Sequence, residues 1–268
     1  MNQNELVIKV LSINDELAHP YMLYESPGET HQCIYSFCLG KSLSELWDLT
    51  IPSHIAYAKK TNSDYFCFNK PAIETGKDAS LIHQEKSGIT YNKLAYLRLL
   101  ADYQKILYLD LDVAVNSAAP SIFSIYNLED IDFVAYNESS IDPSGVKEAI
   151  NQCVQVHGGK TWTSNYYFNT GVFLLSNRSL SKLKIQGDKL FAGRWSEQTY
   201  INWLLQNSKI RWLEMDQRFN TIYSLRSEQE LKHSFFLHFA GMTSPKGTNF
   251  PNEHNHRIQI IKKYLSGN

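Results

Sequence analysis

The sequence predicts an α/β fold, with a single domain in which a mixed, mostly parallel central sheet is flanked by helices. Residues 33–40, 42–60 and 64–68 alternate as strand, helix and strand, which is typical of a parallel, right-handed βαβ unit. Residues 105–115 contain an apolar run that indicates a further, buried strand near the middle of the chain. No internal repeat, low-complexity tract or linker divides the 268 residues, so one domain is expected.

The first elements surround this βαβ unit. Residues 6–13 form a strand-like apolar segment, and residues 26–29 contain the Pro-Gly pair of a turn. The helix over residues 42–60 has apolar side chains at roughly helical spacing, and Pro52 interrupts it. Because proline fits the first turn of a helix, we expect a second helix to begin there. Residues 69–88 are polar and contain proline and glycine, which predicts a surface loop.

The middle of the chain leads into the buried strand. Residues 89–100 predict a helix with leucines on one face and with Lys93 and Arg98 elsewhere on the cylinder. A short helix is expected to begin at residues 120–123, and residues 131–136 predict a further strand.

The second half begins with a long irregular segment. Residues 137–164 are polar and contain three glycines and a proline, which predicts a loop, and a loop of this length in a compact domain is usually functional or mobile. The later segments are predicted from apolar patterning and helix-start residues. They are a turn holding Asn169 and Gly171 followed by a strand up to residue 176, a helix over 196–206 with Ser196 as N-cap, strands at 210–213 and 235–241, and an amphipathic helix over 256–265.

Composition restricts the class of partner. The chain is 43% hydrophobic and 20% charged, which is ordinary for a globular protein. Its net charge is about −1 with balanced signs, which argues against nucleic acid or a strongly basic membrane contact as the main partner. Aromatic residues make up 13% of the chain, which suits a carbohydrate or nucleotide partner, although any one of them is as readily explained as core or surface packing.

Cysteine usage and targeting signals predict a compartment. The four cysteines form no CxxC pair and lie in apolar contexts, so we expect reduced thiols in a cytoplasmic protein. There is no apolar run of 18 residues, and residues 1–5 do not resemble a signal peptide. These observations predict a soluble protein with at most peripheral membrane contact.

Two carboxylates end the buried central strand. Asp110 and Asp112 flank Leu111, and strand alternation places both carboxylates on the same side. Like charges about 4 Å apart repel by about 4 kcal/mol at an effective dielectric constant of about 20. The pair therefore needs a shared proton, a basic partner or a divalent cation, and oxygen ligands of this kind suit Mg²⁺ or Mn²⁺. Our working hypothesis is a metal-dependent enzyme that acts on a phosphate or diphosphate.

Further motifs follow in a characteristic order along the chain. They are Tyr96-Leu-Arg98, residues 105–112, Phe168-Asn-Thr-Gly-Val172, Glu197-Gln198 and His238-Phe-Ala-Gly241. Together these segments resemble the retaining glycosyltransferases of family 8, which have the GT-A fold, a Rossmann-like α/β fold. The resemblance covers roughly residues 33–247 and divides the domain into a nucleotide-sugar-binding half, about 31–136, and an acceptor-side half, about 137–268.

The resemblance implies a reaction and a metal site. A sugar would move from a nucleotide-diphospho-sugar, usually a UDP-sugar, to a glycan or lipid-linked acceptor with retention of anomeric configuration. Asp110, Asp112 and His238 would bind Mn²⁺ or Mg²⁺, and imidazole with two carboxylates suits Mn²⁺ better than Ca²⁺. The alternatives are a salt-bridged turn for each aspartate and a hydrogen-bonded core histidine for His238.

The resemblance also implies donor contacts. Lys246 would reach the diphosphate, although the family usually has Lys-Pro-Trp soon after the glycine, and this chain has Met242-Thr-Ser-Pro-Lys-Gly247. Gly241 fits a backbone that passes close to a phosphate. The remaining expected contacts lie on the central elements; they are Lys93, Arg98, Leu111 and Gly171, with Tyr35, Phe37 and Leu39 at the end of the first strand of the main sheet as nucleoside contacts by topology.

Three polar residues are expected near the reacting sugar. The resemblance places Asn169 close to the transferred sugar, and it gives Glu197 and Gln198 the role of an acidic-Gln pair that recognises sugar hydroxyls. Each has a structural alternative, because asparagine favours an Asx turn and an acidic residue at a helix start complements the helix dipole.

Two other functions remain open at this point. A haloacid-dehalogenase-like phosphatase also places Asp-x-Asp after a strand, and residues 172–176 resemble its second motif. Its Asp pair normally lies on the first strand, however, and residues 214–216 supply only a poor version of its later acidic motif. The other alternative is a non-catalytic nucleotide-sugar-binding protein, although the two aspartates, the histidine and the Glu-Gln pair are all present.

Overall fold

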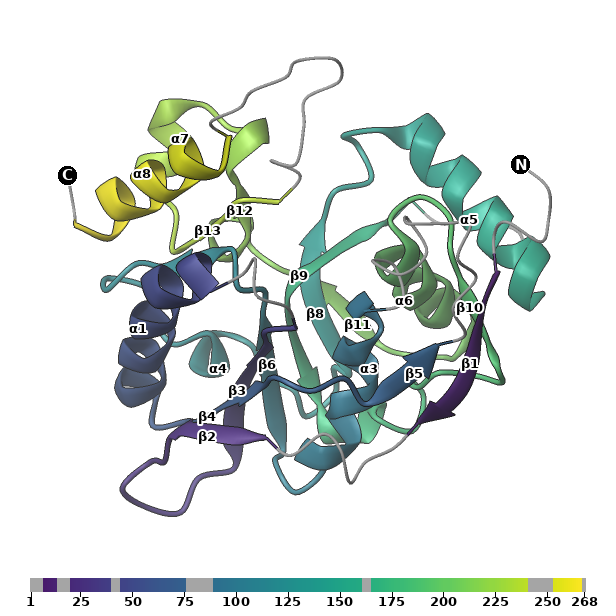
Figure 1. Ribbon diagram of the computed structural model, residues 1–268, viewed down its shortest axis with the longest axis horizontal. Coiled ribbons are helices and arrows are strands. Elements are labelled where there is room, and N and C mark those ends of the chain that lie inside the picture. The colour runs from purple at the N-terminus through teal and green to yellow at the C-terminus, as the bar shows by residue number, and fades with distance from the viewer. Residues whose placement is uncertain are drawn as a thin grey trace.

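A seven-stranded mixed sheet forms the centre of the molecule (Figure 1). The computed structural model describes residues 7–13, 20–39, 44–75, 89–160, 165–240 and 253–266. Five of the seven strands run in one direction, and β2 and β9 oppose them, so the predicted mixed, mostly parallel α/β sheet is confirmed. The strand order is β11 (Trp212–Glu214), β8 (Phe133–Asn137), β9 (Phe168–Ser176), β6 (Lys105–Leu109), β3 (Gln32–Phe37), β4 (Asp64–Phe68) and β2 (Tyr21–Tyr24).

The βαβ unit is present as predicted, and its helix is continuous. Strands β3 and β4 pair in parallel and are joined by α1 (Ser44–Thr61). The predicted break at Pro52 is wrong, because Pro52 lies inside this helix. An interior proline removes one backbone hydrogen bond and costs about 3 kcal/mol. The buried face of the helix, which includes Ile51, and the Thr50 hydroxyl, which donates to the Leu46 carbonyl at 2.8 Å, help to hold the helix together.

The N-terminal strand belongs to a separate small sheet. Strand β1 (Val7–Ile13) pairs with β10 (Lys189–Phe191) and with β5 (Ile73–Thr75), both in antiparallel orientation. The prediction of a loop over residues 69–88 is therefore wrong at β5. A strand of three residues carries little pattern of its own, and it forms because a distant strand offers it hydrogen bonds.

A second small sheet follows the aspartate pair. It contains β7 (Val113–Val115), β13 (Phe236–His238) and β12 (Thr221–Ile222), with β13 in the centre. Strand β7 begins directly after Asp112, and β13 ends at His238. This sheet therefore brings the last part of the chain back to the aspartate pair.

Helices cover both faces of the central sheet (Figure 1). On one face, α1 and α4 (Ile122–Ile125) contribute to a core cluster with the sheet. On the other face, α3 (Asn92–Leu97) and α6 (Ser196–Asn207) form a second cluster. The predicted helix over 89–100 is present and ends in the 3₁₀ turn η4 (Arg98–Leu100). Every residue of α3 is buried, including Lys93. The helix therefore does not have one buried apolar face with Lys93 outside it, as the sequence predicted.

The predicted loop over residues 137–164 is wrong over most of its length. Residues Pro143–His157 form helix α5, which packs against α6. The Asp142 side chain accepts a hydrogen bond from the Gly145 amide at 3.0 Å, and Pro143 occupies the first turn. Val146, Ile150 and Cys153 are buried at spacings of four and three residues, which is a helical pattern. The sequence thus contained both a start signal and an apolar face for this helix.

Two details of the next elements also differ from prediction. Strand β9 is continuous from Phe168, and all nine of its residues are buried, so no turn is formed at Asn169 and Gly171. It pairs with β6 on one side and with β8 on the other, and both pairs are antiparallel. Helix α6 is capped by Trp195 in a left-handed conformation (φ 50°, ψ 44°) rather than by Ser196, which is its first residue.

The remaining elements complete the molecule. They are the 3₁₀ turns η5 (Asn177–Ser179), η6 (Gln217–Phe219) and η7 (Tyr223–Leu225), and the helices α7 (Glu228–Lys232) and α8 (Glu253–Leu265). All four cysteines are free, and three of them are buried, as the sequence predicted. Among the residues that the structure describes, no helix has both the length and the apolar character that a membrane span requires.

Candidate metal centre

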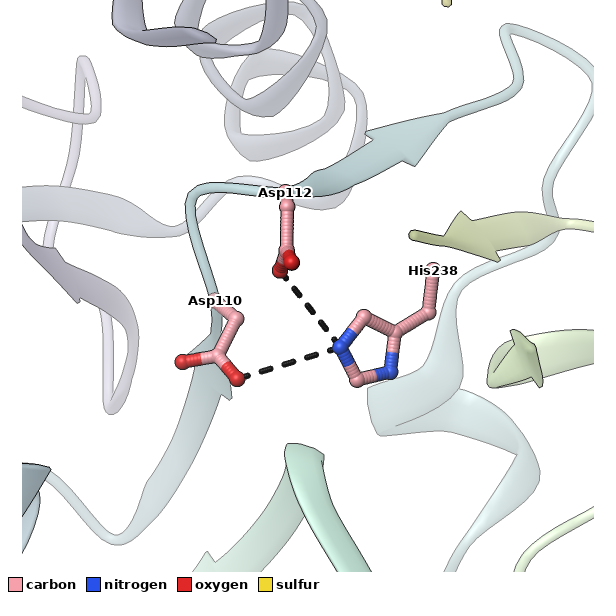
Figure 2. Close-up of side chains that lie close together, drawn as sticks. All are labelled: Asp110, Asp112 and His238. Carbon is pink, nitrogen blue, oxygen red and sulfur yellow. Dashed lines mark ion pairs between the residues drawn. The ribbon is translucent and has the colours of Figure 1, made fainter. Parts of the chain in front are cut away.

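The aspartate pair lies in a turn between two strands. Asp110 follows β6, and the Val113 amide donates to the Asp110 carbonyl at 3.1 Å, which closes the turn. The two aspartates therefore lie in a turn, and the prediction that strand alternation aligns their side chains is wrong. Both carboxylates nevertheless point toward His238 (Figure 2). Asp112 is followed at once by β7, whose pairing with β13 sets His238 opposite Val113. The register between β7 and β13 therefore places His238 close to the two carboxylates.

These three side chains form a compact cluster. His238 Nε2 lies 3.4 Å from Asp112 Oδ1 and 3.9 Å from Asp110 Oδ2 (Figure 2). One ligand atom from each residue can be chosen so that all three lie within 4.8 Å of one another. The two carboxylates are 26% and 22% exposed, and the imidazole is 3% exposed. A cation arriving from solvent would meet the carboxylates first, with the histidine behind them.

Gly171 makes room for the histidine. A Cβ atom at this position would lie 2.0 Å from Cε1 of His238, which is far inside van der Waals contact. The Gly171 carbonyl also accepts a hydrogen bond from the Asp110 amide at 2.8 Å. Glycine is therefore required here because β9 passes directly beneath the imidazole.

A chain of amide groups leads away from His238. Its Nδ1 lies 2.9 Å from Asn220 Oδ1, and Asn220 Nδ2 lies 3.0 Å from Asn169 Oδ1. Asn169 Oδ1 also accepts from the Gly171 amide at 2.9 Å, and its Nδ2 donates to Glu138 Oε2 at 3.1 Å. The predicted site residue Asn169 is therefore connected to the candidate metal ligand through Asn220.

The Glu-Gln pair is held by hydrogen bonds on both sides. Gln198 Nε2 donates to Glu138 Oε1 at 2.5 Å, and Gln198 Oε1 accepts from the Thr170 amide at 3.2 Å. Burial raises the pKa of Glu138, and the hydrogen bonds from Asn169 and Gln198 partly oppose that shift. The sequence analysis did not identify Glu138 or Asn220 as site residues. Glu138 lies just after the end of a predicted strand, and that position could have indicated a site residue.

A buried lysine connects the two acidic parts of the site. Lys93 Nζ lies 3.2 Å from Asp110 Oδ1 and 3.1 Å from Glu197 Oε1, and it donates to the Thr170 carbonyl at 3.1 Å. Glu197 Oε1 also accepts from the Thr170 hydroxyl at 2.6 Å. Burial lowers the pKa of Lys93, but the carboxylates of Asp110 and Glu197 outweigh this effect and raise it.

The pKa values of Glu197 and His238 are set by burial and by the charged side chains around them. Burial raises the pKa of Glu197, and the ammonium of Lys93 opposes the shift. For His238, burial alone lowers the pKa, but the carboxylates of Asp112 and then Asp110 exceed that effect, so the pKa lies above its usual value. The two carboxylates therefore favour the imidazolium form of His238.

Comparison with known proteins identifies the class. A family model described as "Glycosyl transferase family 8" matches residues 68–247, which is more than half of the chain. The chain belongs to glycosyltransferase family 8. This protein is therefore a transferase enzyme, and neither the phosphatase nor the non-catalytic binding protein receives support from the comparison.

Solved structures resemble this family 8 glycosyltransferase at low identity. One, titled as the bifunctional glycosyltransferase WbbM, aligns with a TM-score of 0.54 at 11% identity and covers 91% of this chain and 53% of its own. It supports the fold alone, and with the family match and the mixed sheet it confirms the predicted GT-A fold. No curated protein sequence matches the chain.

Two further structures align over most of both chains. A glycosyltransferase involved in glycosylation of the major capsid of PBCV-1 is 18% identical, with a TM-score of 0.47 and coverage of 87% of this chain and 98% of that one. The galactosyltransferase LgtC, solved with donor and acceptor sugar analogs, is 16% identical, with a TM-score of 0.48 and coverage of 87% and 96%.

Some expected donor contacts of the glycosyltransferase lie in its core. Tyr35 is fully buried, its hydroxyl donates to the Lys93 carbonyl at 3.0 Å, and its ring lies 4.9 Å from that of Tyr108. The side chain of Tyr35 therefore packs in the core, and its expected contact with the nucleoside stays a prediction. Leu111 is also buried, with 6% exposure, so its side chain packs inward. Tyr108 supports the site directly, because its hydroxyl donates to Asp110.

The other expected contacts are spread more widely. Phe37 is buried near the end of β3, and Leu39 just beyond it is half-buried. Arg98 is exposed at the start of η4, and burial of part of its side chain lowers its pKa. Gly241 and Lys246 lie outside the described residues. The structure therefore brings together the candidate metal ligands, Lys93 and the residues expected near the sugar, and the expected nucleoside contacts stay predictions.

Proposed function

We propose that this glycosyltransferase moves a sugar from a nucleotide-diphospho-sugar, with a UDP-sugar as the first candidate donor, to a glycan or lipid-linked acceptor. The reaction would require Mn²⁺ or Mg²⁺ and would retain the anomeric configuration. The observation that carries the proposal is the cluster of Asp110, Asp112 and His238 in an enzyme of family 8. The four free cysteines support the proposed cytoplasmic location.

The residues of the cluster fit a divalent cation. Two carboxylates and one imidazole suit Mn²⁺ and also accept Mg²⁺. Asp110 forms ion pairs with Lys93 and His238, and Asp112 forms an ion pair with His238. A bound cation would replace the proton that His238 shares with these carboxylates. When bound, it would stabilise the negative charge that develops on the diphosphate as the glycosidic bond breaks.

The chain's own residues support a same-face route. Glu197, the predicted acidic residue near the sugar, is buried and engaged by Lys93 and Thr170. A side chain held in this way is poorly suited to attack the anomeric carbon. We therefore propose that the bond from the anomeric carbon to the phosphate oxygen breaks while the bond to the acceptor oxygen forms on the same face. The proton of the acceptor hydroxyl would pass to the departing phosphate oxygen.

The deciding experiment combines ligand screening with product analysis. UDP-, GDP- and ADP-sugars would be tested by thermal shift with Mn²⁺, and the stabilising donor would then be incubated to measure slow Mn²⁺-dependent release of free sugar. NMR would assign the anomeric configuration of the first-formed product. We expect stabilisation by one nucleotide class, release that stops in excess chelator, and retention. Release that is unchanged in chelator would contradict the metal, and an inverted product would contradict the route.

Metal affinity should depend on pH through His238. The imidazole must be neutral to bind a cation, and Asp112 and Asp110 face it and raise its pKa above the usual value of about 6.5. Lys93 opposes that rise. Mn²⁺ affinity should thus be full at high pH and fall as pH drops through a midpoint above about 6.5, approaching tenfold per pH unit below it. Calorimetric titration of Mn²⁺ from pH 9 to 6 would measure this, and a flat affinity would exclude His238 as a ligand.

A further inference from the structure

The chain of amide groups behind His238 has only one consistent arrangement of donors and acceptors. It begins at a backbone amide, the N–H of Gly171, which can only donate. Its partner must therefore be the oxygen of Asn169, and the NH₂ group of Asn169 then faces the carboxylate of Glu138 at 3.1 Å, which can accept it. The backbone at one end and Glu138 at the other fix the same orientation of Asn169.

The orientation of Asn220 follows from that of Asn169. The oxygen of Asn169 accepts a second hydrogen bond, so the group of Asn220 that lies 3.0 Å away must be its NH₂ group. The oxygen of Asn220 then faces Nδ1 of His238 at 2.9 Å. An amide oxygen cannot donate, so Nδ1 must carry the proton. Asn220 is fully buried, and its amide oxygen faces Nδ1 of His238 directly.

From these contacts we infer that Asn220 is a positioning residue that holds His238 in the Nδ1–H tautomer. This leaves the lone pair of Nε2 directed at Asp110 and Asp112, as metal ligation requires. Free neutral imidazole in water prefers the opposite tautomer, with the proton on Nε2. The inference rests on the proposed metal role of His238, and it extends the site to Asn220, which lies immediately before β12.

The same small sheet explains why Asn220 is in place. Strand β12 pairs in parallel with β13, and Ile222 is the partner of His238 in that register. The backbone just before β12 is held by the 3₁₀ turn η6, in which the Asn220 amide donates to the Gln217 carbonyl at 3.0 Å. Asn220 is therefore positioned by backbone structure that does not depend on the metal.

The test uses the ring nitrogens directly. In metal-free wild-type protein at a pH where the ring is neutral, ¹⁵N-detected ring spectra should show His238 protonated at Nδ1 and unprotonated at Nε2. Asn220→Leu should lose this preference and bind Mn²⁺ about 10- to 100-fold more weakly, as is usual when a partner of a metal-bound histidine is removed. Asn220→Asp should keep the Nδ1–H tautomer, because its carboxylate still accepts from Nδ1. Its loss of Mn²⁺ affinity should be smaller than that of Asn220→Leu, because it removes only the hydrogen bond to Asn169.

A matched control separates positioning from general damage. Asn202 is also fully buried, and it bonds the backbone of Phe168 at 2.7 and 2.9 Å without contacting His238. Asn202→Leu should lower thermal stability while the ring signals of His238 stay unchanged. Wild-type protein protonated at Nε2, or Asn220→Leu with unchanged tautomer and Mn²⁺ affinity, would overturn the inference. If Asn220→Leu does not fold, the wild-type and Asn220→Asp spectra decide.

The outcomes also distinguish this inference from the proposed function. A wild-type ring in the Nδ1–H tautomer with no measurable Mn²⁺ binding would refute the metal role of the site and leave the positioning by Asn220 intact. Normal Mn²⁺ binding in Asn220→Leu would leave the proposed function intact and refute the positioning role.

Discussion

Asp112→Asn should lose sugar transfer almost completely, by at least about 10² to 10³ in rate, which is the usual effect of removing one group that stabilises developing charge. Asparagine has nearly the same shape as aspartate, so the turn after β6 should persist. What is lost is one of the two carboxylates beside His238 that are proposed to bind the metal. Mn²⁺ affinity and transfer should therefore fall together, while the folded protein remains.

Asp112 gives a cleaner test than Asp110. Asp110 also pairs with Lys93 and accepts from the Tyr108 hydroxyl, so its replacement would disturb a buried ion pair as well as the metal. The matched control is Asp102→Asn, an exposed aspartate before the opposite end of β6. The control should transfer sugar at the wild-type rate. Wild-type turnover by Asp112→Asn would refute the metal assignment.

Gly171→Ala should damage both stability and metal binding. The added methyl group would lie 2.0 Å from Cε1 of His238, and β9 cannot retreat because it is paired on both sides. Overpacking of this kind commonly costs about 1–3 kcal/mol. Since the imidazole is the part that can move, we expect it to turn away from Asp110 and Asp112, and Mn²⁺ affinity should fall as well.

Thermal unfolding and Mn²⁺ titration would measure the two effects. At about 2–4 °C per kcal/mol for a domain of this size, the melting temperature should fall by several degrees. Gly28→Ala is the matched control, because a Cβ there meets nothing within 4 Å, and its effect should stay within about 0.5 kcal/mol. A Gly171→Ala protein with wild-type stability and Mn²⁺ affinity would show that His238 is not confined by β9.

Predictions from sequence succeeded where the pattern is local and strong. The apolar runs of β3, β4 and β6 indicated buried strands, and the segment between β3 and β4 indicated their parallel connection. Helix α5 was missed although Asp142, Pro143 and a buried face at helical spacing were present, because glycine and polar residues in the same segment favoured a loop. Strand β5 could not be predicted, since it is three residues long and its partner strand β1 is distant in the sequence.

The site shows the same division. The chemical types of three motifs can be read directly from the sequence; these are the Asp-x-Asp pair, His238 and the Glu-Gln pair. Their order along the chain was enough to indicate the family. Lys93 was expected to contact the donor, but it is buried between Asp110 and Glu197. A lysine on a helix is usually solvated, and nothing in the neighbouring residues predicts that two distant carboxylates will enclose it.

The sequence by itself determined the fold class, the family and the chemical types of the candidate metal ligands. Only the tertiary structure decided how these groups act on one another. It placed Gly171 against His238, joined Asn169 to His238 through Asn220, and set the pKa of His238 above its usual value. Local patterns depend on neighbours in the chain, whereas tautomers, ion pairs and pKa values depend on groups that meet only when β7 and β13 pair.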